Sequence, residues 1–286
     1  MQQLNEYNNK VCTAQMFASA LAERGVQMFI LKGIAFGTYY DEPAMRDFGD
    51  CDCYLDEKQS VGDDVCVQLG GKVEHGTYKH SHLNLNNLLI ENHRFFTDFN
   101  GTKRGRLMES VLEKELNDHD NTFISDSKMI CPNSRFNALF LLKHHLTDFL
   151  EDGIILRMIY DWAILLKKEQ NIIDWQSLYH EMGKCRLRNF ADVLTSISVK
   201  YLGLKLSNSA ITQSTDDSVI NDVLSDTLSN SLRMEVGESI VHKVQRVFYR
   251  IKRMWHYRKL SYKSYPSMLV NNFLFCYSVR KKIVFN

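Results

Sequence analysis

The segment "DCDCYL", residues 50–55, constrains the fold more than any other part of this 286-residue chain. Acidic and apolar side chains alternate along it, and such alternation is typical of a β-strand. Successive residues of a strand point to opposite faces, so Asp50 and Asp52 share one face. The residues that follow each of them, Cys51 and Cys53, share the other. We therefore predict a strand with its cysteine face in the core.

The two aspartates on one face repel each other. Residues i and i+2 of a strand lie about 6.5–7 Å apart at Cα. Two charges separated by about 6 Å repel by about 3 kcal/mol at an effective dielectric constant of about 20. A cation between Asp50 and Asp52 removes this cost, and hard oxygen ligands suit Mg²⁺ or Mn²⁺. Two solvated acids at the start of a strand are the simpler alternative, since the pair alone is a weak signal.

A lysine, a glycine and an arginine precede the aspartates. Lys32 and Gly33 end a predicted strand, "QMFILKG", and precede a predicted helix. An ammonium group and backbone N–H groups at such a turn could bind phosphate oxygens. Arg46, shortly before the first aspartate, could add a charge-assisted hydrogen bond.

A third acid lies farther along the chain, in the apolar stretch "LLIENHRFF". A carboxylate such as Glu91 is costly in a buried strand unless it is paired or bound to a metal. If it faces the aspartates, the three acids form the constellation that metal-dependent phosphoryl and nucleotidyl transfer requires. His93 shares the strand face of Glu91, so it could contact this acid or a substrate, and a merely structural role is equally open.

The order of predicted elements indicates an α+β protein. A helix near the N-terminus is followed by strand, helix, strand, helix, strand and strand, which predicts a small mixed-sheet domain over residues 1–130. Four segments of helical periodicity then predict a helical bundle over residues 131–210. Residues 211–286 are predicted to form a polar linker and a basic helical region. The predicted strands cover residues 27–33, 50–55, 72–79 and 85–96.

The composition excludes several classes of protein. No stretch approaches the roughly 18 consecutive apolar residues of a membrane helix. The first residues, "MQQLNEYNNK", have neither the basic start nor the apolar core of a signal peptide. The seven cysteines, an odd number at scattered positions, indicate no disulfide framework. They include no CxxC pair, which argues against a thiolate zinc site. We expect a cytoplasmic protein with reduced cysteines and no stable membrane insertion.

Histidines cluster in the stretch "HGTYKHSH", which contains His75, His80 and His82. A zinc site is conceivable there. Zinc sites need further ligands, and the sequence shows no carboxylate or cysteine at ligand spacing nearby. We therefore expect exposed histidines of a loop or strand.

Basic residues are concentrated at the C-terminus. Residues 242–286 contain 11 Lys and Arg and no Asp or Glu, although the whole chain has a net charge of only +1. Aromatic residues alternate with the basic ones, a pattern that can bind RNA or DNA through phosphate contacts and stacking. We favour an amphipathic helix docked on its own bundle, with its basic side chains reaching into water. An interfacial membrane helix is the third alternative.

Three motifs occur in a characteristic order: "ILKG" (30–33), "RDFGDCD" (46–52) and "IENH" (90–93). Together they resemble the nucleotidyltransferase superfamily, which has a β-polymerase-like fold, and within it the branch of uncharacterised bacterial nucleotidyltransferases. The likeness continues into the helical part, where "PNSRFNALFLLKHH" is similar to a family helix that ends in histidine. The segment "LRMIYDWAILL" is similar to the family's helix with an arginine and an aspartate.

The resemblance implies a role for each matching residue. Asp50 and Asp52 would hold the catalytic Mg²⁺ or Mn²⁺. Glu91 would be the third acid, which assists metal binding or deprotonates the acceptor hydroxyl. Lys32 and Gly33 would hold the triphosphate. Many superfamily members have Gly–Ser at this phosphate turn, where this chain has Lys–Gly, and most have Asp as the third acid.

In the helical part the resemblance gives His144 a place lining the cleft, and it gives Arg157 and Asp161 possible contacts with the substrate. The simplest alternative for the last two is a structural ion pair, since they lie four residues apart on a predicted helix. His144 and its neighbour His145 point in different directions on a helix, so one is expected to be packed and the other exposed.

The implied reaction is attack by an acceptor hydroxyl on the α-phosphorus of a nucleoside triphosphate. A nucleoside monophosphate moves to the acceptor and pyrophosphate leaves. The acceptor, whether a small molecule, an RNA or a protein, is left open. The alternative is a non-catalytic member of the same fold that binds nucleotides or nucleic acid.

Overall fold

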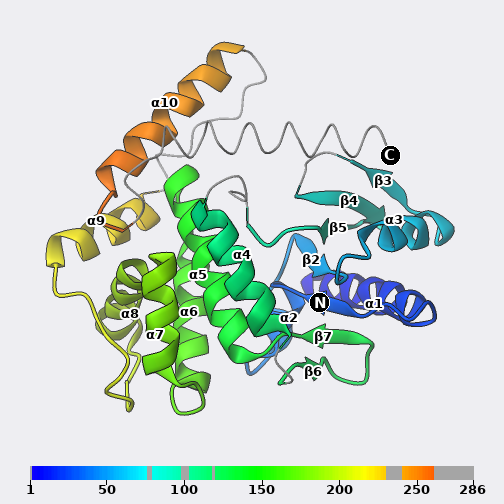
Figure 1. Ribbon diagram of the computed structural model, residues 1–286, viewed down its shortest axis with the longest axis horizontal. Helices are drawn as coiled ribbons and strands as arrows, with labels where there is room; N and C mark the ends of the chain where they lie inside the picture. Colours follow the sequence, from blue (N-terminus) through cyan, green and yellow to red (C-terminus); the bar gives the residue numbers. More distant parts are fainter. Residues whose placement is uncertain (1, 76–78, 98–102, 118–119, 230–239, 261–286) are drawn as a thin grey trace. The chain divides into compact units, whose positions relative to one another are not determined.

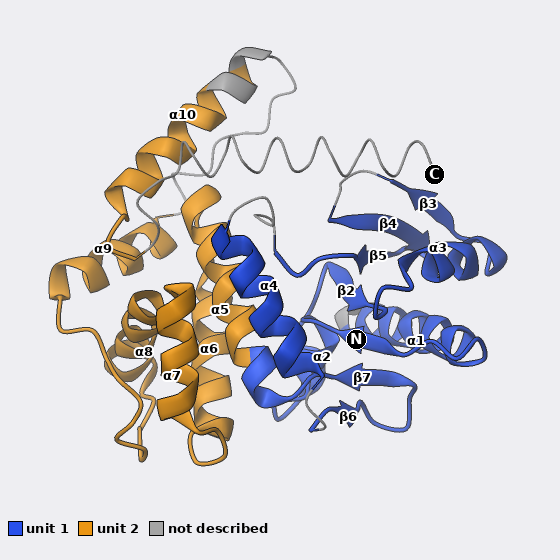
Figure 2. Cartoon of the chain, in the orientation of Figure 1, with its two compact units in different colours: residues 1–137, 270–286 blue, residues 138–269 orange. Residues whose placement is uncertain are grey.

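The structure, a computed structural model, describes residues 2–75, 79–97, 103–117, 120–229 and 240–260 (Figure 1). These residues fall into two compact units, with the boundary between Asn137 and Ala138 (Figure 2). The first unit is mixed α/β and the second is helical, which confirms the predicted α+β class. The basic region after Leu260 and the middle of the histidine-containing stretch, residues 76–78, lie outside the described residues.

One mixed sheet organises the first unit. Its strands are β1 (Met28–Ile30), β2 (Asp50–Tyr54), β3 (Lys72–Glu74), β4 (His80–Leu85), β5 (Leu88–His93), β6 (Thr122–Phe123) and β7 (Met129–Cys131). They form a seven-stranded sheet in the order β3-β4-β5-β2-β1-β7-β6. β2 pairs in parallel with β5, and β1 with β7, whereas the other neighbours are antiparallel. Two strands far apart in the sequence, β2 and β5, thus lie side by side in the sheet.

Helices α1 and α3 pack against each other and against the sheet. The helices of this unit are α1 (Gln2–Ala22), α2 (Ile34–Gly37), the 3-10 helix η1 (Pro43–Met45), α3 (Gln59–Gln68) and α4 (Lys103–Leu116). Cys51 and Cys53 are fully buried in the core that these helices form with the sheet, together with Phe17 and Leu21 of α1. The prediction that the cysteine face of "DCDCYL" lies in the core is confirmed.

The strand predicted over residues 85–96 is wrong at its start. β4 and β5 form an antiparallel hairpin, and Leu85 pairs with Leu88 across its turn. The two turn residues, Asn86 and Asn87, have φ angles of 48° and 64°. Two positive φ angles are typical of a type I′ turn, which asparagine tolerates better than most residues. Four further elements, β4, α4, β6 and β7, were not predicted from the sequence.

The second unit consists of helices in its described part. They are α5 (Ser134–Glu151), whose first turn belongs to the first unit, and then α6 (Leu156–Glu169), α7 (Trp175–Cys185), α8 (Arg188–Leu202), α9 (Asp217–Leu228) and α10 (Ile240–His256). The fully buried indole of Trp162 donates to Thr195 Oγ1 at 3.0 Å and so ties α6 to α8. No helix among the described residues has both the length and the apolar composition needed to cross a bilayer.

The described part of the basic region, α10, is docked on the second unit. Arg253 is 6% exposed and forms a bidentate pair with Asp226 of α9, at 2.6 and 2.8 Å, and it also donates to the carbonyl oxygen of Phe149. Arg250 contacts Asp152 at 2.9 Å. These arginines are neutralised within the unit, which agrees with the docked amphipathic helix that the sequence analysis favoured.

We expect Arg253→Met to lower the free energy of unfolding by about 3–5 kcal/mol, because it leaves the buried Asp226 carboxylate without its partner. Lys184→Met removes a more exposed ion pair with Glu181, and should lower the free energy of unfolding by about 1 kcal/mol or less. Urea denaturation followed by circular dichroism measures both values. Similar losses in the two variants would contradict the importance of the buried pair.

Candidate active site

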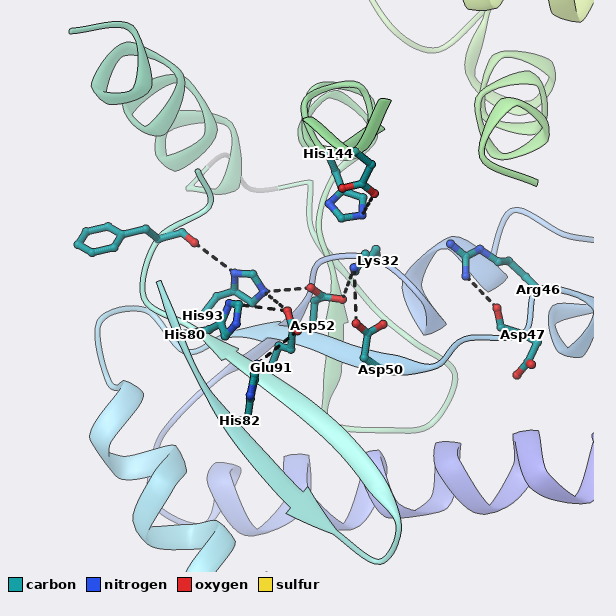
Figure 3. A network of polar contacts seen from close by, with 12 residues as sticks. Lys32, Arg46, Asp47, Asp50, Asp52, His80, His82, Glu91, His93 and His144 are labelled. Atoms are coloured by element: carbon teal, nitrogen blue, oxygen red, sulfur yellow. Dashed lines mark hydrogen bonds and ion pairs between the residues drawn. The ribbon is translucent and has the colours of Figure 1, made fainter. Parts of the chain in front are cut away.

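Three carboxylates meet on one face of the sheet, at β2 and β5 (Figure 3). The parallel register sets Asp52 directly opposite Glu91, and Asp50 is the next residue of β2 on the same face. One oxygen atom from each of the three carboxylates lies within 4.8 Å of the others. The structure therefore brings together the three acids that the sequence analysis selected.

Lys32 lies at the two aspartates. It comes two residues after the end of β1, and the N–H of the intervening Leu31 donates to the carbonyl oxygen of Asp52 at 2.9 Å. The Lys32 Nζ atom is 3.0 Å from Asp52 Oδ2 and 3.8 Å from Asp50 Oδ2. Burial alone would lower the pKa of Lys32, but the negative charges of Asp52 and Asp50 outweigh it and raise this pKa. The ammonium group is thus charged and compensates part of the acid cluster.

The aspartates differ in their exposure to solvent. The Asp52 side chain is 3% exposed, whereas that of Asp50 is 34% exposed. The pKa of Asp50 is raised, first by partial burial and then by the charge of Asp52, while Lys32 opposes the rise. The cluster therefore concentrates negative charge that a cation stabilises.

Gly33 adopts a backbone conformation that other residues rarely take. Its φ is 59° and its ψ is −105°, and it immediately precedes α2. A Cβ atom at this position would lie 3.4 Å from the carbonyl oxygen of Asp50 and from Phe48 Cβ. A side chain here would be strained and tightly packed, so the turn after Lys32 depends on glycine.

His93 is bonded to the acids from the end of β5. Its side chain is 1% exposed, with Nε2 2.9 Å from Asp52 Oδ1 and 3.4 Å from Glu91 Oε2. The other ring nitrogen, Nδ1, is 3.2 Å from the carbonyl oxygen of Phe95, which can only accept a hydrogen bond. Burial would lower the pKa of His93, but the hydrogen bonds with Asp52 and Glu91 outweigh it and raise this pKa. His93 thus fixes the orientation of Asp52.

His80 and His82 face the same acid from β4, which the sequence analysis did not expect. The antiparallel register sets His82 opposite Glu91 and His80 opposite His93. His80 Nδ1 is 3.7 Å from Glu91 Oε2, and His82 Nε2 is 3.6 Å from Glu91 Oε1. Burial lowers the pKa of His80 to about 4. His75 is 69% exposed and lies beside Asp63 instead.

The expectation that no carboxylate lies near these histidines is wrong, because Glu91 approaches them across the β4–β5 pair. The spacing of His80 and His82, two residues apart before the Asn–Asn turn, is the sequence signal for a shared strand face. The turn itself had to be recognised before that signal could point to Glu91.

The remaining predicted site residues lie elsewhere. Arg46 precedes β2 on its loop, and its guanidinium group donates to the carbonyl oxygen of Asp47 at 3.0 Å, away from the three acids in Figure 3. The other three belong to the second unit. There His144 Nε2 is 3.1 Å from Asp148 Oδ2, Asp161 is fully buried, and Arg157 is exposed. Their contacts with a substrate stay predictions.

The acid cluster has the donor chemistry for a divalent metal ion. Its three ligands are carboxylate oxygens, which suit Mg²⁺ or Mn²⁺. Asp52 is a buried charge, and a buried carboxylate needs a cation or hydrogen bonds nearby. A metal ion at such a site can bind phosphate oxygens in its remaining positions, which is the chemistry of phosphoryl and nucleotidyl transfer.

The chain was compared with protein families, solved structures and curated proteins. A family model described as "Uncharacterised nucleotidyltransferase" matches residues 2–203. Among solved structures, the crystal structure of ANT(2″)-Ia in complex with adenylyl-2″-tobramycin matches with a TM-score of 0.42 and 11% sequence identity. That match covers 66% of this chain and 99% of the other. No curated protein matches the sequence.

We expect Lys32→Met to destabilise the metal-free protein by about 3–5 kcal/mol, because it leaves the buried Asp52 uncompensated. Added Mg²⁺ should recover most of this loss, since the ion replaces the missing positive charge. Lys10→Met is the matched control, because Lys10 contacts Asp47, outside the cluster, at 3.4 Å. Thermal unfolding with and without Mg²⁺ checks this. An equal Mg²⁺ effect in both variants would refute the compensation.

Proposed function

Because the chain belongs to the family described as uncharacterised nucleotidyltransferases, we propose that it transfers a nucleoside monophosphate from a nucleoside triphosphate to an acceptor hydroxyl. The observation that supports this most is the convergence of Asp50, Asp52 and Glu91 from two parallel strands on one face of the sheet. Three carboxylates at this spacing suit the binding of a divalent ion together with phosphate. The acceptor is a small molecule, an RNA or a protein.

Each residue of the acid cluster has a proposed task. Asp50, Asp52 and Glu91 hold Mg²⁺ or Mn²⁺. When bound, this ion neutralises charge on the phosphates and lowers the pKa of the acceptor hydroxyl. His93 keeps the Asp52 carboxylate in one orientation through the 2.9 Å contact. Glu91 is also the candidate for accepting the proton of the acceptor.

The triphosphate is assigned to the turn after β1. Lys32 carries a positive charge on a flexible side chain within reach of both aspartates, so it can contact a phosphate held there by the ion. Gly33 keeps the backbone clear of a side chain at the same turn. Arg46 is the second proposed phosphate contact. Much of the catalysis then comes from holding the reacting groups in position.

A non-catalytic role in nucleotide binding is the second candidate. It is favoured by the Lys–Gly sequence of the turn, which lacks the serine hydroxyl of many superfamily members, and by the position of Lys32 against the aspartates. Nucleotide binding that depends on Mg²⁺, without transfer to any acceptor, would support this candidate.

The proposed transfer is tested with each of the four α-labelled nucleoside triphosphates, Mg²⁺ or Mn²⁺, and pools of acceptors. Total tRNA, a cell lysate and a metabolite extract serve as the pools. We expect label to move to one pool with the native protein. Asp52→Asn should reduce the rate by at least about 100-fold, since it removes a negative ligand and disturbs its neighbours.

Asp47→Asn is the matched control, because Asp47 precedes the cluster by only a few residues and its side chain is 44% exposed. It should retain transfer. An equal loss in both variants would contradict the assignment of the site. If no label moves, calorimetry with Mg²⁺ and each nucleotide shows whether the protein binds nucleotide but lacks its acceptor, or does not bind nucleotide. The absence of any binding would overturn the proposed function.

A further inference from the structure

Three histidines surround the one acid that β5 contributes to the acid cluster. Glu91 has His93 two residues away on its own strand face, and β4 adds His80 and His82 from the other side (Figure 3). The rings of His80 and His82 stack with their centroids 4.8 Å apart. His80 and His82 therefore face Glu91 from the side away from the aspartates' strand, and His93 Nε2 lies between Glu91 and Asp52.

We propose that His80, Glu91 and His93 form a second cation site, rich in nitrogen, that binds Zn²⁺ or a similar transition metal ion in preference to Mg²⁺. One ligand atom from each of the three residues lies within 4.8 Å of the others. Two imidazoles with one carboxylate are a common ligand set for zinc, which leaves a further position for water or a substrate. Mg²⁺ prefers oxygen ligands and is disfavoured at such a site.

The two distances from Glu91 to the histidines fit ligands around an ion better than they fit hydrogen bonds, whereas His93 Nε2 is also hydrogen-bonded to Asp52 Oδ1 at 2.9 Å. Ligands bound about 2.0–2.1 Å from a tetrahedral ion lie about 3.4 Å apart. Glu91 Oε2 is 3.4 Å from His93 Nε2 and 3.7 Å from His80 Nδ1. Hydrogen bonds between nitrogen and oxygen usually span about 2.7–3.2 Å. Small movements would bring Glu91 to ligand spacing with both histidines, and a bound ion would replace the hydrogen bond between His93 and Asp52.

His93 is also oriented as a ligand. Its Nδ1 is 3.2 Å from the carbonyl oxygen of Phe95, so that nitrogen carries the hydrogen and Nε2 faces the carboxylates. A backbone carbonyl on the far nitrogen is the usual way in which proteins fix the tautomer of a metal-binding histidine. The strand end thus supplies both the ligand and its support.

The two sites share Glu91 but differ in chemistry. The acid cluster offers oxygen ligands alone, whereas the second site offers two nitrogens and one oxygen. An ion in the second site would hold Glu91 in place beside Asp52 whatever reaction follows. The inference therefore does not depend on the proposed transfer, and metal binding alone tests it.

The test titrates the full-length, metal-free protein with Co²⁺ in the presence of saturating Mg²⁺. We expect one equivalent to bind and to give visible absorption typical of nitrogen and oxygen ligands, and Zn²⁺ to displace it. His80→Asn should weaken Zn²⁺ binding by about 10–100-fold or more. Asp50→Asn should leave it within about 3-fold, because Asp50 belongs to the acid cluster alone.

His75→Asn is the matched control from the same stretch of sequence, since its ring is 69% exposed and lies outside the site. Its Zn²⁺ affinity should equal that of the native protein. Thermal unfolding of each metal-free variant shows whether it is folded, and X-ray absorption of the Zn²⁺-loaded native protein counts the imidazoles directly. An unchanged affinity in folded His80→Asn, absence of imidazole scattering, or an absorption band from a thiolate ligand would overturn the proposal.

Discussion

The arrangement of the first unit depends on the parallel pairing of β2 with β5, which sets Asp52 against Glu91. This pairing places like charges close together, and such a register is unfavourable unless positive charge or hydrogen bonds compensate it. Lys32 provides the positive charge from the end of β1, and His93 provides the hydrogen bond from the end of β5. The three strands that form the middle of the sheet are thus joined electrostatically as well as through their backbones.

The same register also determines the core. Because the strand period is two, the alternation that directs Asp50 and Asp52 to the site directs Cys51 and Cys53 into full burial. A shift by one residue would put carboxylates among the apolar side chains of α1 and α3. Burial of the cysteine face in the core and placement of the acidic face at the site are therefore one structural constraint, which gives the site a fixed position on the fold.

The features that were predictable from sequence are those carried by short segments. The alternation at Asp50–Cys53 gave the strand and its two faces, and the apolar surroundings of Glu91 marked it as unusual. Contacts between strands were not visible in this way. The hairpin at Asn86–Asn87 was missed because its turn depends on two positive φ angles, and with it the approach of His80 to Glu91. Pairing between distant strands is decided by the whole sheet rather than by any one segment.

The position of Lys32 has a consequence for measured affinities. In the metal-free protein the Lys32 ammonium group lies 3.0 Å from Asp52, so a positive charge already occupies the place where an added divalent ion would bind. The side chain acts as an intramolecular competitor, present at a constant effective concentration however dilute the protein is. The apparent dissociation constant for a divalent ion then equals the intrinsic constant divided by the fraction of molecules in which Lys32 has moved away from the acids. The intrinsic affinity of the three carboxylates for a divalent ion is therefore higher than the affinity that a titration of the protein alone measures.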